Sequence, residues 1–337
     1  MTTITPRERV WQAIRHQQPD RVPYHFGYTA PARRKAEAHY GTTDLDHLLG
    51  DHLMIYSTRR HAPWKELRPG YWRDEFGVVW NRTIDVDIGV VDDYPLKGRS
   101  LQGCSIPDAR DPRRYEDLPR LIAAYADRFR VAQIGFSLFE RAWSLRSMPE
   151  LLVDMLEAPA WVDELLDALV AFDLGVIDHV LQYDIDAIFF GDDWGHQQGL
   201  LMGPHLWRRF IKPRIRELYA AVKRAGKAVL IHSCGKVQEL FPELIELGLD
   251  VFNPLQPEVM DPYEIKRRFG HELSFFGGMS IQQVLPHGTP QVVRDEARRL
   301  MERIGQGGGY IIAPAHDMPG DIPIENMVAF IETVRAG

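Results

Sequence analysis

The stretch Val229-Leu230-Ile231-His232-Ser233-Cys234-Gly235 begins as a run of apolar residues and ends in two side chains that can bind a metal ion. Residues two apart in an extended strand point to the same side, so His232 and Cys234 should project together. An imidazole nitrogen and a thiolate sulfur are both good zinc ligands, and Gly235 permits a sharp turn directly after them. The stretch therefore predicts a buried strand with a pair of metal ligands at its end. A buried histidine and a buried thiol without a metal are the alternative, because two ligands do not make a site.

Length and composition limit the classes of protein that this chain can represent. Its 337 residues fit one large α/β barrel or two ordinary domains, and an apolar fraction of 45% is enough for a sizeable core. A formal net charge of -7 does not favour nucleic-acid binding, which usually needs a basic face. No apolar run approaches the roughly 20 residues that span a bilayer, and no secretory signal is visible, so we expect a cytoplasmic protein without a membrane anchor. The presence of only Cys104 and Cys234 does not suggest a disulfide framework.

Apolar runs of strand length alternate with helical patterns over most of the chain. Several of the expected helices begin near a proline and end at a glycine, as between Pro204 and Gly226, which is typical of helix ends. This alternation indicates a parallel sheet covered by helices. An open doubly wound sheet is the alternative, but no G-x-G-x-x-G follows the first strand. The eight expected strands would form a (β/α)8 TIM barrel and cover residues 22–27, 51–56, 132–140, 187–194, 227–235, 249–257, 273–280 and 310–317.

Two segments depart from this rhythm. Residues 5–16 predict an N-terminal helix, because apolar residues recur there at helical spacing. Residues 71–82 predict a β-hairpin of aromatic and β-branched residues, and we interpret about 69–95 as a β insertion. The insertion would serve as a lid or as the contact of a homodimer. We expect a single domain over residues 1–337.

Polar and ionisable residues gather where the expected strands end. The chemistry of a (β/α)8 barrel takes place at the C-terminal ends of its strands, so these residues predict a site at the barrel mouth. Each has a structural alternative: Glu140 could pair with Arg141, Asp192 or Asp193 could cap a turn, and His196 could lie on a surface loop. The candidates are His25, Tyr28, Glu140, Asp192, Asp193, His196, His232, Cys234, Asn253, Gln256, His316 and Asp317.

The second half of the chain carries a set of short motifs at these strand ends and at helix starts. They are Asp192-Asp193-Trp194-Gly195, Met202-Gly203-Pro204, Phe210-Ile211-Lys212-Pro213, His232-Ser233-Cys234-Gly235, residues 250–257, Phe276-Gly277-Gly278 and Pro323-Ile324-Glu325-Asn326. Together they resemble the uroporphyrinogen decarboxylase superfamily. The resemblance covers most of residues 130–337 and implies a (β/α)8 barrel, in agreement with the strand count.

This superfamily has two main activities, and the motifs favour one of them. Its true decarboxylases carry an arginine-rich segment of the type R-Q-A-G-R-Y, which residues 26–34 of this chain lack, and an acidic chain suits their polycarboxylate substrate poorly. Its corrinoid-dependent methyltransferases and O-demethylase components bind zinc through an H-x-C pair and a later cysteine. His232 and Cys234 match the pair, and His316 stands near the place of the missing cysteine. The resemblance implies zinc with His232, Cys234, His316 and Glu140 as metal ligands, a harder set than one with two thiolates.

The resulting hypothesis is a zinc-dependent methyltransferase. It would move a methyl group from a small methylated substrate, for example an aryl methyl ether, to a corrinoid (cobalamin) carried by a partner protein. Zinc would polarise the substrate oxygen, Asp193 or His196 would protonate or orient it, and Asn253 and Gln256 would be cofactor-binding residues. Two alternatives stay open: a metal-free decarboxylase of a non-porphyrin acid, and a non-catalytic barrel that binds a corrinoid or another ligand.

Overall fold

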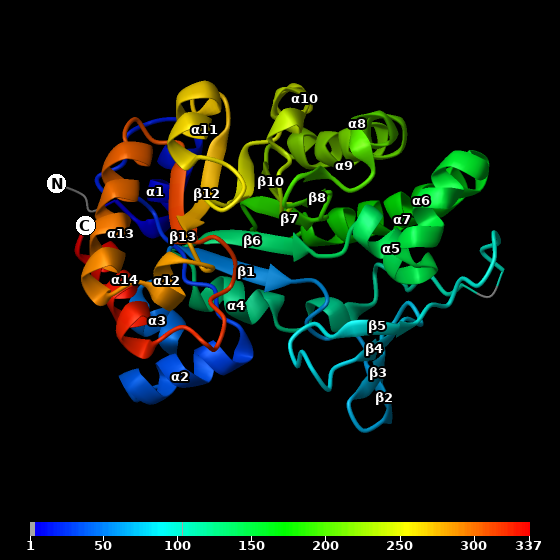
Figure 1. Cartoon of the computed structure of the whole chain (residues 1–337), viewed down its shortest axis with the longest axis horizontal. Helices are drawn as coiled ribbons and strands as arrows, with labels where there is room; N and C mark the ends of the chain where they lie inside the picture. Colours follow the sequence, from blue (N-terminus) through cyan, green and yellow to red (C-terminus); the bar gives the residue numbers. More distant parts are fainter. Residues whose placement is uncertain (1–3, 103) are drawn as a thin grey trace.

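The computed structural model describes residues 4–102 and 104–337 of the chain. Its centre is a parallel sheet whose strands follow one another in the order β1-β6-β7-β10-β11-β12-β13. Helices connect the successive strands across the outer face (Figure 1). These strands are β1 (Leu53–Ser57), β6 (Phe129–Ile134), β7 (Ala187–Gly191), β10 (Ala228–His232), β11 (Val251–Leu255), β12 (Ser274–Met279) and β13 (Tyr310–Pro314).

Residues 22–28 occupy the eighth place and close the sheet into a barrel. Tyr24 forms a parallel bridge with Ile312 of β13, and its carbonyl accepts a hydrogen bond from the His52 backbone N–H at 3.2 Å, directly before β1. Pro23 has no N–H to donate, which explains why this segment makes isolated bridges and not a regular ladder. The predicted (β/α)8 barrel is therefore confirmed, with its first strand reduced to a bridging segment.

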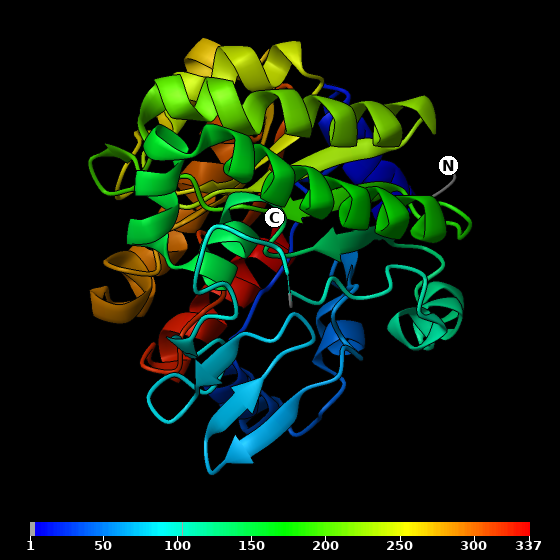
Figure 2. The same ribbon diagram turned by 90° about the vertical axis from the view of Figure 1, so that its right-hand side faces the viewer.

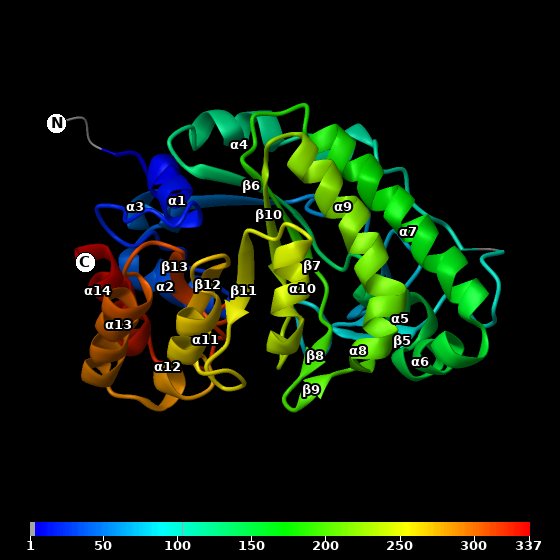
Figure 3. The same cartoon turned by 90° about the horizontal axis from the view of Figure 1, so that it is seen from above.

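Helices cover the outside of the barrel. Figures 2 and 3 show two long helices, α7 (Pro159–Val180) and α9 (Lys212–Arg224), packed side by side. Within the described residues, no helix combines the length and the apolar character that crossing a membrane requires. The other helices are α1 (Pro6–Ile14), which is the predicted N-terminal helix, α2 (Ala30–Tyr40), α3 (Leu45–Leu49), η1 (Pro112–Tyr115), α4 (Leu118–Ala124), α5 (Phe139–Arg146), α6 (Met148–Glu157), α8 (Gly203–Leu206), η2 (Trp207–Ile211), η3 (Gln238–Leu240), α10 (Phe241–Glu246), α11 (Pro262–Phe269), α12 (Val284–His287), α13 (Pro290–Ile304) and α14 (Ile324–Ala336).

The predicted β insertion forms an antiparallel sheet of its own that projects from one side of the barrel (Figure 1). Buried Asp74 attaches it to α5, because its carboxylate accepts hydrogen bonds from Arg141 Nη1 at 3.0 Å and from Trp80 Nε1 at 3.2 Å. Its hairpin joins β3 to β4 as expected, whereas the sheet begins a few residues before the predicted limit. The strands are β2 (Lys65–Arg68), β3 (Tyr71–Arg73), β4 (Val79–Asn81) and β5 (Val90–Asp93).

The third barrel strand ends earlier than predicted. We expected it over residues 132–140, but β6 stops at Ile134, and Glu140 lies in the first turn of α5. Phe136 takes a positive φ of 54°, a conformation that interrupts an extended strand. Glu140 consequently reaches the barrel mouth from a helix.

Alternation along β10 sets the direction of the predicted ligand pair. Val229 and Ile231 pack outward between the sheet and the helices, whereas Leu230 packs inward with Phe189 and Phe276. His232 follows Leu230 by two residues and therefore projects to the same inner side. The apolar inner layer forms the floor of the barrel mouth.

Candidate metal centre

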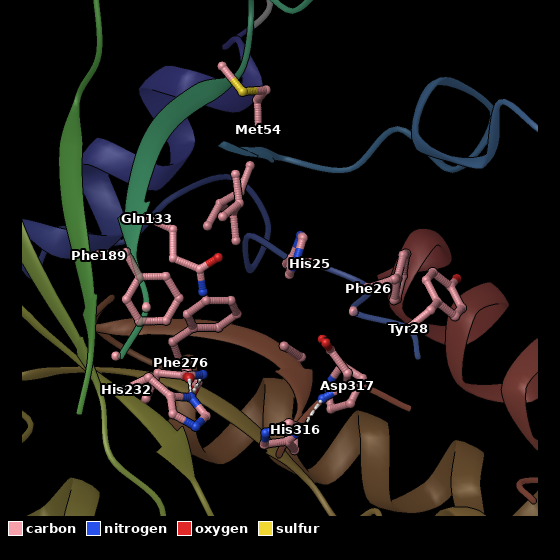
Figure 4. A pocket seen from close by; sticks show the side chains of 18 of the residues that line it. His25, Phe26, Tyr28, Met54, Gln133, Phe189, His232, Phe276, His316 and Asp317 are labelled. Atoms are coloured by element: carbon pink, nitrogen blue, oxygen red, sulfur yellow. Dashed lines mark hydrogen bonds between the residues drawn. The ribbon is translucent and has the colours of Figure 1, made fainter. Parts of the chain in front are cut away.

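Three of the four predicted metal ligands come together at the barrel mouth. The donor atoms of His232, Cys234 and His316 all lie within 4.8 Å of one another, and Figure 4 shows both histidines on the wall of a cavity. The Cys234 Sγ atom is 3.3 Å from His232 Nε2. Two such ligands of a tetrahedral zinc ion would stand about 3.6 Å apart, given usual zinc–nitrogen and zinc–sulfur bond lengths. The spacing of His232 and Cys234 thus fits zinc, and His316 as a third ligand would leave a fourth position free.

Asn253 determines which nitrogen of His232 faces the other ligands. The two residues are partners in the parallel register of β10 and β11. Asn253 Oδ1 lies 2.6 Å from His232 Nδ1, and its Nδ2 donates to the Phe276 carbonyl at 3.1 Å. This assignment places a hydrogen on His232 Nδ1 and leaves the Nε2 lone pair for a metal. Asn253 thus orients the His232 ring, and cofactor binding by Asn253 stays a prediction.

Asp193 and Gln256 hold the loop that carries Cys234. Asp193 Oδ1 accepts a hydrogen bond from the Cys234 backbone N–H at 2.7 Å and lies 3.7 Å from His232 Nε2. Gln256 Oε1 accepts from the Gly235 N–H at 3.2 Å. Asp193 lines the cavity, whereas Gln256 is buried behind the loop and is not among the cavity-lining residues. The geometry therefore makes Gln256 a support for the turn after Cys234.

Glu140 does not join the group of donor atoms. It lines the same cavity, and its backbone N–H donates to Asp192 Oδ1 at 2.8 Å. Burial, together with the carboxylates of Asp193 and Asp192, raises the pKa of Glu140 well above its ordinary value. The raised pKa favours the protonated carboxyl group, which is better suited to donate a proton than to bind a cation. Glu140 as a fourth metal ligand stays a prediction.

His196 is not brought to the cavity. It lies in β8 (Gly195–His196), which pairs with β9 (Gly199–Leu200) in a short hairpin, and its side chain is exposed. Its Nδ1 accepts a hydrogen bond from the Gln198 N–H at 3.3 Å. The surface-loop alternative describes His196 better than the proposed role in proton transfer.

The surroundings shift the pKa of two of the three donor groups toward their neutral form. Burial, followed by the negative charge of Asp193, raises the pKa of the Cys234 thiol, and burial lowers the pKa of His316. His316 Nδ1 accepts a hydrogen bond from the Asp317 N–H at 2.8 Å, so Nε2 carries the hydrogen in this conformation. His316 would have to turn its ring to bind a metal through Nε2, whereas His232 is already oriented. Two imidazoles and a thiol suit zinc and do not suit magnesium or calcium.

The cavity beside these donors has a volume of about 790 Å³. Aromatic rings of Phe136, Phe189 and Phe276 line its apolar part. His25 also lines it, and its Nδ1 lies 3.0 Å from Asp51 Oδ2. Asp51 was not predicted, because it precedes β1 and the stagger of the barrel, which brings it beside His25, leaves no mark in the sequence.

Residues 110–337 match the family described as uroporphyrinogen decarboxylase (URO-D). The chain belongs to this family. The matched region contains the three gathered donors, Asn253 and Glu140, whereas the His25–Asp51 pair precedes it. The resemblance inferred from the motifs is therefore confirmed at the level of the family.

Relatives of this URO-D family member carry the names of both activities. The methylated-thiol–coenzyme M methyltransferase of Methanosarcina mazei is 24% identical over 223 residues, which are 66% of this chain and 55% of that protein. The uroporphyrinogen decarboxylase of Methylococcus capsulatus is 24% identical over 256 residues, 72% of this chain and 70% of that protein. A solved methyltransferase from Methanosarcina mazei has a TM-score of 0.75 at 18% identity, covers 99% of both chains, and shares the fold. Sequence identity therefore does not distinguish a methyltransferase from a decarboxylase. The two activities have to be distinguished by the chemistry of the residues in the site.

Proposed function

We propose that this URO-D family member is a zinc-dependent methyltransferase. It moves a methyl group from a small methylated substrate, such as an aryl methyl ether, to a corrinoid carried by a partner protein. The observation that carries the proposal is the gathering of the donor atoms of His232, Cys234 and His316 within 4.8 Å of one another, beside the cavity that both histidines line. The printed name of the Methanosarcina mazei relative, a methyltransferase, supports the same reaction class.

The donor set supports zinc as the resident metal. His232, Cys234 and His316 would hold the ion, and zinc would supply a Lewis acid at this end of the cavity. Asn253 keeps the His232 Nε2 lone pair directed at the site. Asp193 keeps the Cys234 backbone in place through its N–H.

Transfer of a methyl group from an ether consumes one proton. The oxygen–carbon bond breaks, the corrinoid takes the methyl group with its Co(I) electron pair, and the oxygen leaves as an alcohol or phenol after protonation. Glu140 lines the cavity, and its raised pKa favours the protonated form, which can donate a proton. We assign the proton donation to Glu140, with Asp193 as its neighbour on the same wall.

The arginines that line the cavity do not favour a polycarboxylate substrate. Arg33 pairs with Asp46 at 3.3 Å, and Arg128 donates to the Asp46 carbonyl at 2.6 Å. Arg60 pairs with Asp117 at 3.2 Å. Because these guanidinium groups already have partners, the aromatic walls are left to bind a small, largely apolar molecule.

Metal analysis combined with a methyl-transfer assay tests the proposal. Purified protein should contain about one zinc per chain, and His232→Ala and Cys234→Ala should lose both the zinc and the methylation of a reduced corrinoid protein. Cys104→Ala is the matched control, because Cys104 is also a free cysteine but is not part of the group of donor atoms, so its replacement should not affect either measurement. Full activity after chelation, or zinc content unchanged in both variants, would reject the proposal. Decarboxylation that resists chelators would favour the metal-free decarboxylase.

A further inference from the structure

His25 and Asp51 form a pair on the cavity wall that the metal centre does not use. His25 Nδ1 lies 3.0 Å from Asp51 Oδ2, and the Phe26 N–H donates to the same oxygen at 3.3 Å. The His25 ring rests edge-on against Phe276, with a centroid distance of 5.8 Å. His25 Nδ1 and Asp51 Oδ2 form an ion-pair contact that is not aligned as a hydrogen bond. These contacts keep the Nδ1 side of the ring at Asp51 and leave Nε2 for a ligand in the cavity.

Polar atoms without partners lie around this pair. Asp51 is only 4% exposed, yet its Oδ1 has no hydrogen-bond partner in the part of the chain that the structure describes, and neither has the buried hydroxyl of Tyr28. Both residues line the cavity. The Asp317 carboxylate lies against Gly27, where an added Cβ would stand 2.1 Å from Asp317 Oδ1. Buried polar atoms rarely lack partners, so this end of the cavity is built for a hydrogen-bonding group of a ligand.

The charges around His25 determine which functional group of a ligand can bind beside it. Burial lowers the pKa of His25, but the carboxylates of Asp51, Asp317 and Asp46 outweigh it and raise the pKa above its ordinary value. The raised pKa favours the imidazolium form of His25, in which Nε2 carries a hydrogen and donates. A ligand carboxylate would be repelled by Asp51 and Asp317, and an ammonium group would be repelled by His25. A hydroxyl can accept from Nε2–H and donate to Asp51 Oδ1 or Asp317, so it satisfies both kinds of neighbour.

Aromatic rings connect this pair to the metal centre. Phe189 lies 6.5 Å from the His232 ring and 6.1 Å from Phe276, which in turn packs against His25. Figure 4 shows His25 and His232 on separate walls of the cavity, with Phe189 and Phe276 beside them. A ligand with a flat apolar body that lies along these rings would place one end at the His25–Asp51 pair and the other end at the metal centre.

We infer that His25, oriented by Asp51, binds a hydroxyl group of the substrate on a wall separate from the metal centre. The substrate class is then a hydroxylated methyl ether with a flat apolar body, whose ether oxygen lies at the metal centre. This inference rests on the proposed function, since it takes the cavity as the place where the methylated substrate binds. Asp51 acts through His25 and is a positioning residue.

Calorimetric titration of zinc-loaded protein, without any corrinoid protein, tests the inference. The ligands are methoxybenzene and the three methoxyphenols, which differ from it by one hydroxyl. At least one methoxyphenol should bind about tenfold or more tightly than methoxybenzene, because an unsatisfied donor at His25 disfavours the ligand without the hydroxyl. His25→Leu should abolish this preference, because no donor is left on this wall to distinguish the ligands with a hydroxyl from methoxybenzene. His25→Gln, which keeps a donor, should retain part of it.

His47→Leu is the matched control. His47 Nδ1 lies 2.9 Å from Asp44 Oδ1 in a similar histidine–aspartate pair, but it is exposed and does not line the cavity. The preference should persist in this variant. Equal affinity of the wild-type protein for all four ligands would by itself overturn the inference. A preference for a methoxyphenol that persists in His25→Leu would also overturn it.

The two proposals fail separately. A preference for methoxyphenols without methyl transfer to a corrinoid protein would reject the proposed function and support the hydroxyl site as a ligand-binding site. Methyl transfer with equal binding of all four ligands would reject the hydroxyl site alone.

Discussion

Asn253 Oδ1 lies 2.6 Å from His232 Nδ1, on the neighbouring strand and at the paired position of the sheet. Because the Asn253 amide nitrogen is fixed by the Phe276 carbonyl, its oxygen is the atom that faces the imidazole. The hydrogen bond therefore fixes both the ring orientation and the nitrogen that is free to bind a metal. The metal centre depends on the register of two strands as much as on its three donors.

Replacing Asn253 should weaken zinc binding without removing a ligand. Asn253→Leu takes away the acceptor at His232 Nδ1, and we expect the zinc dissociation constant to rise about 10- to 100-fold. Asn253→Asp keeps an acceptor and should recover most of the affinity. Competition with a chromophoric chelator measures both, and urea unfolding of the zinc-free proteins separates this effect from a loss of stability. Wild-type affinity in Asn253→Leu would contradict the orienting role.

Glu140→Gln separates proton donation from metal binding. The amide cannot give a proton, so we expect the methyl-transfer rate to fall about 100-fold or more. Zinc content should stay at the wild-type level, because Glu140 is not part of the group of donor atoms. His232→Ala is the comparison, since it should lose zinc and activity together. A Glu140→Gln protein that purifies without zinc would restore Glu140 to the ligand set.

The sequence predicts those parts of the site that follow from local periodicity. The alternation of residues along a buried strand places His232 beside Cys234, and apolar strands separated by helices indicate the barrel that brings their ends together. His316 could be anticipated because it follows another strand end. These relationships depend on neighbours in the chain and on one rule for parallel barrels.

Other parts of the site depend on features that the sequence does not display. Glu140 stands beyond Phe136, whose positive φ ends β6, so its approach from a helix could not be read from a pattern of apolar residues. Asp51 precedes its strand, and only the stagger between residues 22–28 and β1 brings it beside His25. The role of Asn253 required the register between β10 and β11, which sequence periodicity does not specify.

Gly235 should be indispensable to the loop after the ligand pair. It has a φ of 86°, and a Cβ there would lie 2.4 Å from Gly195 C and 2.5 Å from His196 N, which are backbone atoms. Gly235→Ala should therefore displace Cys234 and lower zinc affinity as well as stability. Gly226→Ala is the matched control, because it shares a positive φ of 69° but has nothing within 4 Å of the added Cβ. We expect Gly226→Ala to cost about 1–2 kcal/mol, and Gly235→Ala to cost clearly more in urea unfolding.

His52 should make the barrel closure sensitive to acid. Its Nδ1 accepts a hydrogen bond from the Tyr24 N–H at 3.2 Å, and burial, together with the charges of Arg9 and Arg21, lowers its pKa from 6.5 to about 3. Above pH 6.5 His52 is neutral in both the folded and the unfolded state, so it does not contribute to the pH dependence of the free energy of unfolding. Between pH 6.5 and about pH 3, His52 binds a proton in the unfolded state but not in the folded state. The free energy of unfolding should then fall by about 1.4 kcal/mol per pH unit as the pH decreases.

His52→Gln tests this acid sensitivity, because the amide oxygen can still accept from Tyr24 but does not titrate. Urea unfolding of chelator-treated protein, from about pH 7 down to about pH 4.5, gives the free energy of unfolding without a contribution from zinc. The difference in stability between wild type and His52→Gln should shift in favour of the variant by about 2.5 kcal/mol over this range. His39→Gln is the control, since His39 is exposed and its replacement should leave the wild-type slope unchanged. Parallel pH dependences of wild type and His52→Gln would mean that the folded state accommodates a protonated His52, and the acid sensitivity would have to come from other groups.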